Sequence, residues 1–208
     1  MIRFVYCHLI GIVFLLTAAS PYASAAVEPK ATVVETSCEG FSHKELSFKD
    51  GDRRVSYELP DKWNYRGENG IQLTVPDKPF AEALIRMAPL PKPQPLEEKD
   101  IEAAKQRFLA SLPPGAQMVK LVEEEANPLI LNNSPSYEFT VSYKVMGETF
   151  LRSALFTNVF DTQFVFVFTA RTSDFDVLHR AFRSSLVSWQ WRENQPAVVA
   201  QLPGPVAK

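Results

Sequence analysis

Cysteine and histidine are both scarce in this sequence, which has two cysteines and three histidines in 208 residues. Removal of an N-terminal signal segment would take Cys7 and His8 away and leave Cys38 as the single thiol, so no intrachain disulfide could form. His43 and His179 would then be the remaining imidazoles, and no His-x-x-His, Cys-x-x-Cys or His-Glu-x-x-His spacing occurs. We therefore expect no transition-metal site and no cofactor, and a fold that rests on its hydrophobic core.

A strong excess of one charge is also missing, since 22 basic and 24 acidic residues give a net charge of −2. Nucleic-acid binding requires a clustered basic face, so this balance argues against a nucleic-acid partner and against a polybasic membrane-surface module. The acidic run from Glu123 to Glu125 does not predict a calcium site, because consecutive residues of a strand point to opposite faces.

Motifs for catalysis are absent as well. The chain has no Gly-x-Ser-x-Gly elbow, and two histidines leave few members for a Ser-His-Asp triad. The paired carboxylates Asp174 and Asp176 are explained by the start of a helix, where negative charge is favourable. We predict no catalytic residues, and a hydrolase with an unrecognised site is the enzymatic alternative.

The first 25 residues have the features of an export signal. Arg3 supplies a positive start, Leu9 to Ala19 form an apolar run, and Ala23-Ser24-Ala25 matches an Ala-x-Ala cleavage signal. The run is about half of the roughly 20 apolar residues that a membrane-spanning helix needs, and no cysteine follows it for lipidation. We predict cleavage before Ala26 and a secreted or periplasmic protein without stable membrane insertion, with an uncleaved anchor as the alternative.

Sequence periodicity predicts the organisation that follows the signal. Residues 26–40 are polar and residues 193–208 are rich in proline and alanine, so both are predicted to be disordered around a single domain at residues 41–192. Alternating apolar residues on both sides of Asp50-Gly51 predict a β-hairpin. Further strands are predicted at residues 71–75, 83–88, 117–123, 137–143, 149–159 and 163–170. The last of these has apolar residues on both faces, which is typical of a central strand.

Two helices are predicted between and after these strands. Their apolar stripes are Ile101, Ala104, Phe108 and Leu112 in the first helix, and Phe175, Leu178, Phe182 and Leu186 in the second. Ser173 is predicted to cap the second helix, and Trp189 and Trp191 are predicted to close the edge of the core. Hairpin connections exclude an all-parallel sheet. The predicted fold class is α+β, with an antiparallel β-sheet of about six or seven strands flanked by helices in an α/β/α sandwich.

The order of elements and two motifs resemble the PsbP-like superfamily, the group of the photosystem II extrinsic protein, which includes the DcrB-like envelope proteins and the Ran-release-factor fold. The motifs are Leu59-Pro60-Asp61-Lys62-Trp63 after the hairpin and Ser185-Leu186-Val187-Ser188-Trp189 at the end of the closing helix. The resemblance covers residues 41–191 and implies a noncatalytic binding or assembly role. Photosystem members are associated with calcium or zinc, but no such ligand set maps onto this chain residue by residue.

Five residues are candidates for binding a partner. Trp63, Tyr65, Arg66 and Asn69 combine aromatic and polar groups in a loop between two strands, which is typical of a recognition loop, although Trp63 could instead fill the core. Arg152 shares a strand face with apolar residues, so either that face is exposed there or the arginine needs a carboxylate partner inside the protein.

We therefore expect an exported, monomeric, noncatalytic domain that binds or assembles with an envelope or lumen protein. The alternative is a carrier of a small apolar ligand such as a lipid or a pigment. This alternative follows from the aromatic second half of the chain, in which the sheet and a helix could leave an apolar cleft.

Overall fold

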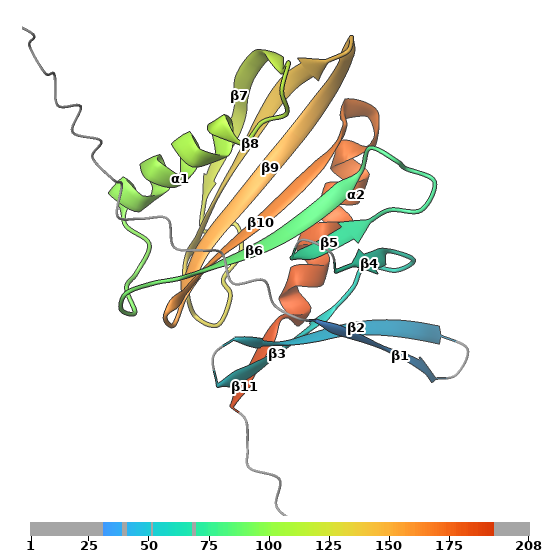
Figure 1. Ribbon diagram of the computed structural model, residues 1–208, viewed down its shortest axis with the longest axis vertical. Coiled ribbons are helices and arrows are strands. Elements are labelled where there is room, and N and C mark those ends of the chain that lie inside the picture. Colours follow the sequence, from blue (N-terminus) through green and yellow to red (C-terminus); the bar gives the residue numbers. More distant parts are fainter. Residues whose placement is uncertain (1–30, 39–40, 51, 68–69, 194–208) are drawn as a thin grey trace, which may run out of the picture.

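The computed structural model describes residues 31–38, 41–50, 52–67 and 70–193, so the predicted signal segment and the tail from residue 194 lie outside it. The described chain forms two antiparallel sheets and two helices (Figure 1). The larger sheet has seven strands in the order β4-β5-β6-β10-β9-β8-β7, and the smaller has four in the order β1-β2-β3-β11.

The strands are β1 (Thr32–Cys38), β2 (Phe41–Asp50), β3 (Arg53–Glu58), β4 (Asn64–Arg66), β5 (Ile71–Thr74), β6 (Glu82–Pro89), β7 (Gln117–Ala126), β8 (Ser136–Val145), β9 (Glu148–Val159), β10 (Thr162–Arg171) and β11 (Gln190–Glu193). The helices are α1 (Glu98–Ala110) and α2 (Thr172–Ser185), and a 3-10 turn at Leu186–Ser188 follows α2.

The predicted antiparallel α+β class is confirmed, but the strands divide between two sheets. The predicted hairpin, β2 with β3, lies in the smaller sheet, whereas the prediction placed all strands in one. The turn from Pro60 to Trp63 ends the hairpin, with the Trp63 amide donating to the Pro60 carbonyl at 3.1 Å, and leads the chain into the larger sheet. After α2 the chain returns, and β11 pairs with β3.

The sequence predicts disorder for residues 26–40, but within this range Thr32–Cys38 form β1, which pairs with β2 along its whole length. From Thr32 to Thr36 every residue of β1 is exposed. The strand therefore lacks the one-sided apolar pattern that marks a half-buried strand, and it is held by its backbone ladder and by β-branched residues suited to a strand.

The larger sheet carries a helix on each face (Figure 1). On one face, α2 contributes Phe175 and Phe182 to a core that also contains Phe168 of β10. On the other face, Phe108 of α1 packs edge-on against Phe139 of β8, with ring centroids 4.9 Å apart. β10 lies between β6 and β9 and has apolar residues on both faces, which confirms the predicted central strand.

Trp189 joins the two sheets at the end of the 3-10 turn. Its ring centroid lies 5.1 Å from that of Tyr57 in β3 and 5.1 Å from that of Phe166 in β10. The side chain is buried, which confirms the prediction that it closes the core. The predicted cap of α2 is wrong, because the helix begins at Thr172 and Arg171, not Ser173, occupies the N-cap position.

Candidate binding cleft

The predicted recognition loop contributes mainly to the core. Trp63 is 3% exposed and stacks on two phenylalanines. Its ring centroid lies 5.9 Å from that of Phe168 and 6.1 Å from that of Phe182. Tyr65 is partly buried against the same core, and Arg66 is exposed. Asn69 lies outside the described residues. Of the three described members, the structure therefore exposes only Arg66 fully, and Trp63 acts as a packing residue.

Arg152 is buried on the α1 face of the larger sheet, away from the predicted loop. Its Nη1 donates to the carbonyl of Ser111 at 3.0 Å, and its guanidinium lies 5.2 Å from the ring centroid of Phe108. Among the described residues no carboxylate forms an ion pair with it, and its Nε has no hydrogen-bond partner. Burial lowers the pKa of this guanidinium below its usual value. The predicted carboxylate partner is therefore not found among the described residues, and a backbone carbonyl and an aromatic ring contact the guanidinium instead.

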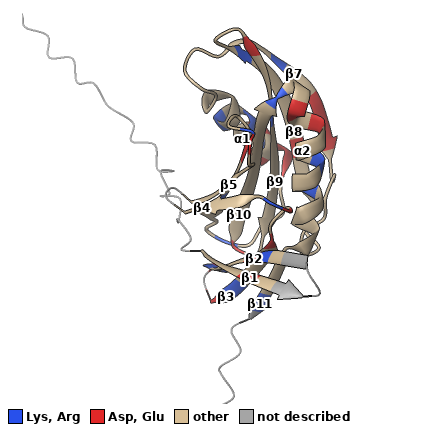
Figure 2. Cartoon of the chain, turned by 90° about the vertical axis from the view of Figure 1, so that its right-hand side faces the viewer, with Lys and Arg blue, Asp and Glu red and all other residues tan. Residues whose placement is uncertain are grey.

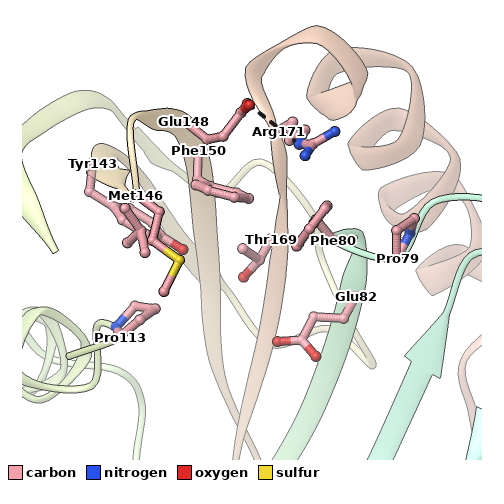
Figure 3. A pocket seen from close by; sticks show the side chains of 11 residues that line it. Pro79, Phe80, Glu82, Pro113, Tyr143, Met146, Glu148, Phe150, Thr169 and Arg171 are labelled. Atoms are coloured by element: carbon pink, nitrogen blue, oxygen red, sulfur yellow. Dashed lines mark ion pairs between the residues drawn. The ribbon is translucent and has the colours of Figure 1, made fainter. Parts of the chain in front are cut away.

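A cleft of about 350 Å³ opens on the same face, beyond the end of α1. A cross-strand row of three residues lines it, Tyr143 of β8, Phe150 of β9 and Arg171 of β10, which are successive partners in the sheet. Phe80, from the segment before β6, closes one side, and Pro113, after α1, closes another (Figure 3). We refer to this site as the aromatic cleft. The remaining lining residues are Pro79, Glu82, Val145, Met146, Glu148 and Thr169.

Aromatic rings dominate the walls of the aromatic cleft. Tyr143 stacks on Phe150 with centroids 5.7 Å apart, and Phe80 meets Phe150 edge-on at 6.1 Å. Met146 and Gly147 both have positive φ, 51° and 84°, as a two-residue type I′ hairpin requires, and this turn places Met146 at the rim. Met146 is 99% exposed and Phe80 is 49% exposed. The cleft therefore presents apolar surface to solvent.

Charged groups stand at the edge of these walls. The Arg171 guanidinium lies 4.3 Å from the ring centroid of Phe80, and its Nε lies 3.6 Å from Oε2 of Glu148 (Figure 3). Glu82 accepts a hydrogen bond from Nε2 of Gln72 at 2.9 Å. The arrangement suits a ligand with an apolar body and a polar end, because the few polar groups can fix its orientation.

The alternation in residues 137–143 correctly predicts one aromatic face of β8, on which Tyr143 lies. It does not identify the cleft, because Phe80 and Arg171 come from other segments and meet Tyr143 only through the register of the sheet. Thr169 and Glu82, which are direct partners across β10 and β6, are likewise brought together only by that register.

Ser153, His179 and Glu138 are the described residues that come nearest to a catalytic triad. Ser153 Oγ lies 3.0 Å from Nε2 of His179, and Oε1 of Glu138 lies 2.8 Å from the same nitrogen. A triad needs the serine and the carboxylate on different imidazole nitrogens, so that the histidine can accept from one and donate to the other. Ser153 is also only 1% exposed. This cluster is suited to anchoring α2 on the sheet, not to nucleophilic catalysis.

A metal-binding cluster and a membrane-spanning helix are both absent from the described residues. Within residues 31–193, where described, no group of three or more His, Cys, Asp or Glu side chains is placed to hold a metal ion. None of the described helices is long and apolar enough to cross a membrane. On the side that carries α2 and β7, acidic and basic residues are interspersed (Figure 2), in keeping with the near-neutral net charge.

No protein-family model and no curated protein matches the chain. Solved structures do resemble it. The cyanobacterial PsbP protein (CyanoP) of Synechocystis sp. PCC 6803 is 13% identical, with a TM-score of 0.51 over 76% of this chain and 98% of its own. LpqN of Mycobacterium tuberculosis, which is involved in cell envelope biogenesis, is 14% identical, with a TM-score of 0.52 over 78% of this chain and 91% of its own. These similarities show that the fold is PsbP-like.

Proposed function

We propose that the protein is an exported, noncatalytic binding domain of the cell envelope or a lumen, and that it carries a small apolar ligand in the aromatic cleft. The observation that carries the proposal is the cleft itself, since a volume of about 350 Å³ and a largely apolar lining are characteristic of small-molecule sites. The Ala-x-Ala signal at residues 23–25 supports export. The involvement of LpqN, a neighbour in fold, in cell envelope biogenesis supports the location.

The exposed apolar walls explain why a ligand would bind. Phe80 and Met146 have their side chains in contact with water in the free protein. A ligand that covers them removes apolar surface from water, which contributes about 25 cal/mol for each Å². Arg171 and Glu148 pair with each other at the rim, so their charges do not oppose an apolar ligand in the cleft.

A matched pair of phenylalanines allows this proposal to be tested. Phe80 and Phe160 are both partly exposed, and each has an arginine guanidinium over its ring, at 4.3 Å from Arg171 and at 3.9 Å from Arg53. Only Phe80 lines the aromatic cleft. Titration of 1-decanol, followed by amide NMR shifts, should show binding that Phe80→Ala weakens about fivefold or more. Phe160→Ala should leave it unchanged, and no saturable binding to the wild type would refute the proposal.

A second candidate function, assembly with an envelope or lumen protein, is favoured by β7. This strand ends the larger sheet, pairs only with β8 among the described strands, and has all ten residues exposed. Met118, Val119, Leu121 and Val122 are apolar residues in it. The other residues of β7 are mostly polar, so the largely apolar stretch at residues 118–122 is the part of this exposed edge suited to pairing with another chain.

Pull-down from the native compartment would test this second role. A defined partner recovered with the wild type and lost with Val122→Lys would support assembly through β7. Equal recovery with both proteins would exclude β7 from that interaction. In the absence of a partner we expect the protein to be a monomer.

A further inference from the structure

A second hollow, of about 270 Å³, lies beside α1 on the face of the sheet that holds the aromatic cleft. Its floor is apolar and includes Val165 and Val167 of β10 and Phe156 of β9, and Ala104 of α1 forms part of its wall. The two charged side chains in its lining are Arg86 of β6 and Arg107 of α1. We call this site the arginine hollow.

No carboxylate is among the residues that line the arginine hollow. Among the described residues, neither Arg86 nor Arg107 forms an ion pair, and Arg107 makes one long contact of 3.5 Å to Oε1 of Gln163. The buried Arg152 adds a third positive charge nearby, because its hydrogen-bond acceptor Ser111 also lines the hollow. Burial is the main cause that lowers the pKa of Arg152. Arg86 lowers this pKa further, whereas Tyr143 and Glu82 raise it. A hollow with an apolar floor and uncompensated positive charge is complementary to a ligand that is apolar and anionic.

The arginine hollow and the aromatic cleft are neighbours along β6 and β10. The pair Glu82 and Thr169 lines the cleft, and the pair Arg86 and Val165 lines the hollow. The pair Leu84 and Val167 separates these two pairs on this face, and its Val167 already lines the hollow. Four residues along a strand span about 13 Å. An extended alkyl chain can therefore pass over the apolar Leu84 from one site to the other.

We infer that the ligand is an anionic amphiphile, whose alkyl chain fills the aromatic cleft and whose carboxylate or phosphate is held by Arg86 and Arg107 in the arginine hollow. This inference rests on the proposed function and adds the chemical class of the ligand. Guanidinium groups bind both anions through paired N–H donors, so the shared chemistry is an anionic head group on an alkyl chain. A cationic head group would be repelled by the two arginines, so a cationic amphiphile is not expected to bind in this way.

The experiment compares three ligands of equal chain length, decanoate, decyl phosphate and 1-decanol, by isothermal titration calorimetry at low ionic strength. The proteins are the wild type, the double variant Arg86→Gln/Arg107→Gln and the control Arg180→Gln. Arg180 is an exposed arginine of α2 that forms no ion pair among the described residues and lies on the opposite face of the sheet. Each exposed contact to an arginine is expected to change the affinity about two- to fivefold.

We expect at least one of the two anions to bind the wild type more tightly than 1-decanol, and the double variant to lose that preference while it retains its affinity for 1-decanol. Preference for decanoate over decyl phosphate would identify a fatty acid as the source of the head group. Preference for decyl phosphate would identify a phospholipid as the source. The inference is overturned if 1-decanol binds as tightly as both anions, or if Arg180→Gln weakens anion binding as much as the double variant. Failure of all three ligands to bind would instead overturn the proposed function and the inference together.

Discussion

The guanidinium of Arg152 lies over the ring of Phe108, 5.2 Å from its centroid, so that a buried charge of β9 contacts the helix that covers this face of the sheet. The same side chain donates to the carbonyl of Ser111, at the C-terminal end of α1. These contacts fix α1 over β8 and β9. The arginine hollow lies beside this helix, over β6, β9 and β10, and the aromatic cleft lies beyond the end of the helix.

Replacement of Arg152 tests this anchoring. Arg152→Ala removes the contact with Phe108 and leaves the Ser111 carbonyl without its donor, so the free energy of unfolding should fall by about 2 to 4 kcal/mol. Arg152→Met keeps most of the apolar stem, so its free energy of unfolding should fall by about half as much. Urea unfolding measures both, with the exposed Arg180→Ala as control. Equal losses for Ala and Met would show that packing of the stem contributes nothing.

Trp189 should be among the residues on which stability depends most. It is 5% exposed and contacts Phe48 and Tyr57 of the smaller sheet as well as Phe164 and Phe166 of the larger. Trp189→Ala should reduce the free energy of unfolding by about 3 to 5 kcal/mol, because it leaves a cavity between the sheets. Val187→Ala, at a residue that is 72% exposed, should change it by less than about 0.5 kcal/mol. A loss under about 1 kcal/mol for Trp189→Ala would show that the two sheets do not depend on this contact.

Asp50 should make stability depend on pH in the unusual direction for a carboxylate. It is 6% exposed, its Oδ1 accepts from Thr162 at 2.8 Å, and its Oδ2 has no partner among the described residues. Burial raises the pKa of Asp50 in the folded protein, with a further contribution from Asp161. Its contribution to stability is therefore fully present below the unfolded pKa of about 3.9 and is lost as pH rises through the folded pKa.

The corresponding test is Asp50→Asn, which removes the titration. The variant should be more stable than the wild type at pH 7, and the difference should shrink as pH falls below the unfolded pKa of about 3.9, where Asp50 becomes protonated in both states. Chemical denaturation across this range measures the effect, with the exposed Asp52→Asn as control. A variant less stable than the wild type at pH 7, with the difference narrowing at low pH, would mean that ionised Asp50 stabilises the fold.

Local sequence patterns predict most of the elements but not how they assemble. Alternation predicts β8, β9 and β10, and the helical stripes that contain Phe108 and Phe182 predict α1 and α2, because burial of one face leaves a periodic signal. β1 has exposed side chains and leaves no such signal. The second sheet depends on the pairing of β11 with β3, between residues more than 130 positions apart, and no local pattern encodes that pairing.

The candidate site was predictable only in part, because local patterns show the aromatic face of a strand but not which strands lie beside it. An apolar cleft between sheet and helix follows from the aromatic face of β8, but its members depend on strand register, which places Phe150 between Tyr143 and Arg171. Trp63 was ambiguous in the sequence, because a tryptophan after a turn is equally suited to a loop surface and to a core. Its stacking on Phe168 and Phe182 resolves that ambiguity.

Native mass spectrometry of the protein purified gently from its own compartment tests the central claim, the binding of a ligand in the aromatic cleft, most directly. The wild type should carry a copurifying small molecule, seen as an additional mass that collisional activation removes. Phe80→Ala should carry much less of it, and Phe160→Ala as much as the wild type. A wild-type protein without any such mass, or equal loading of all three proteins, would contradict the account.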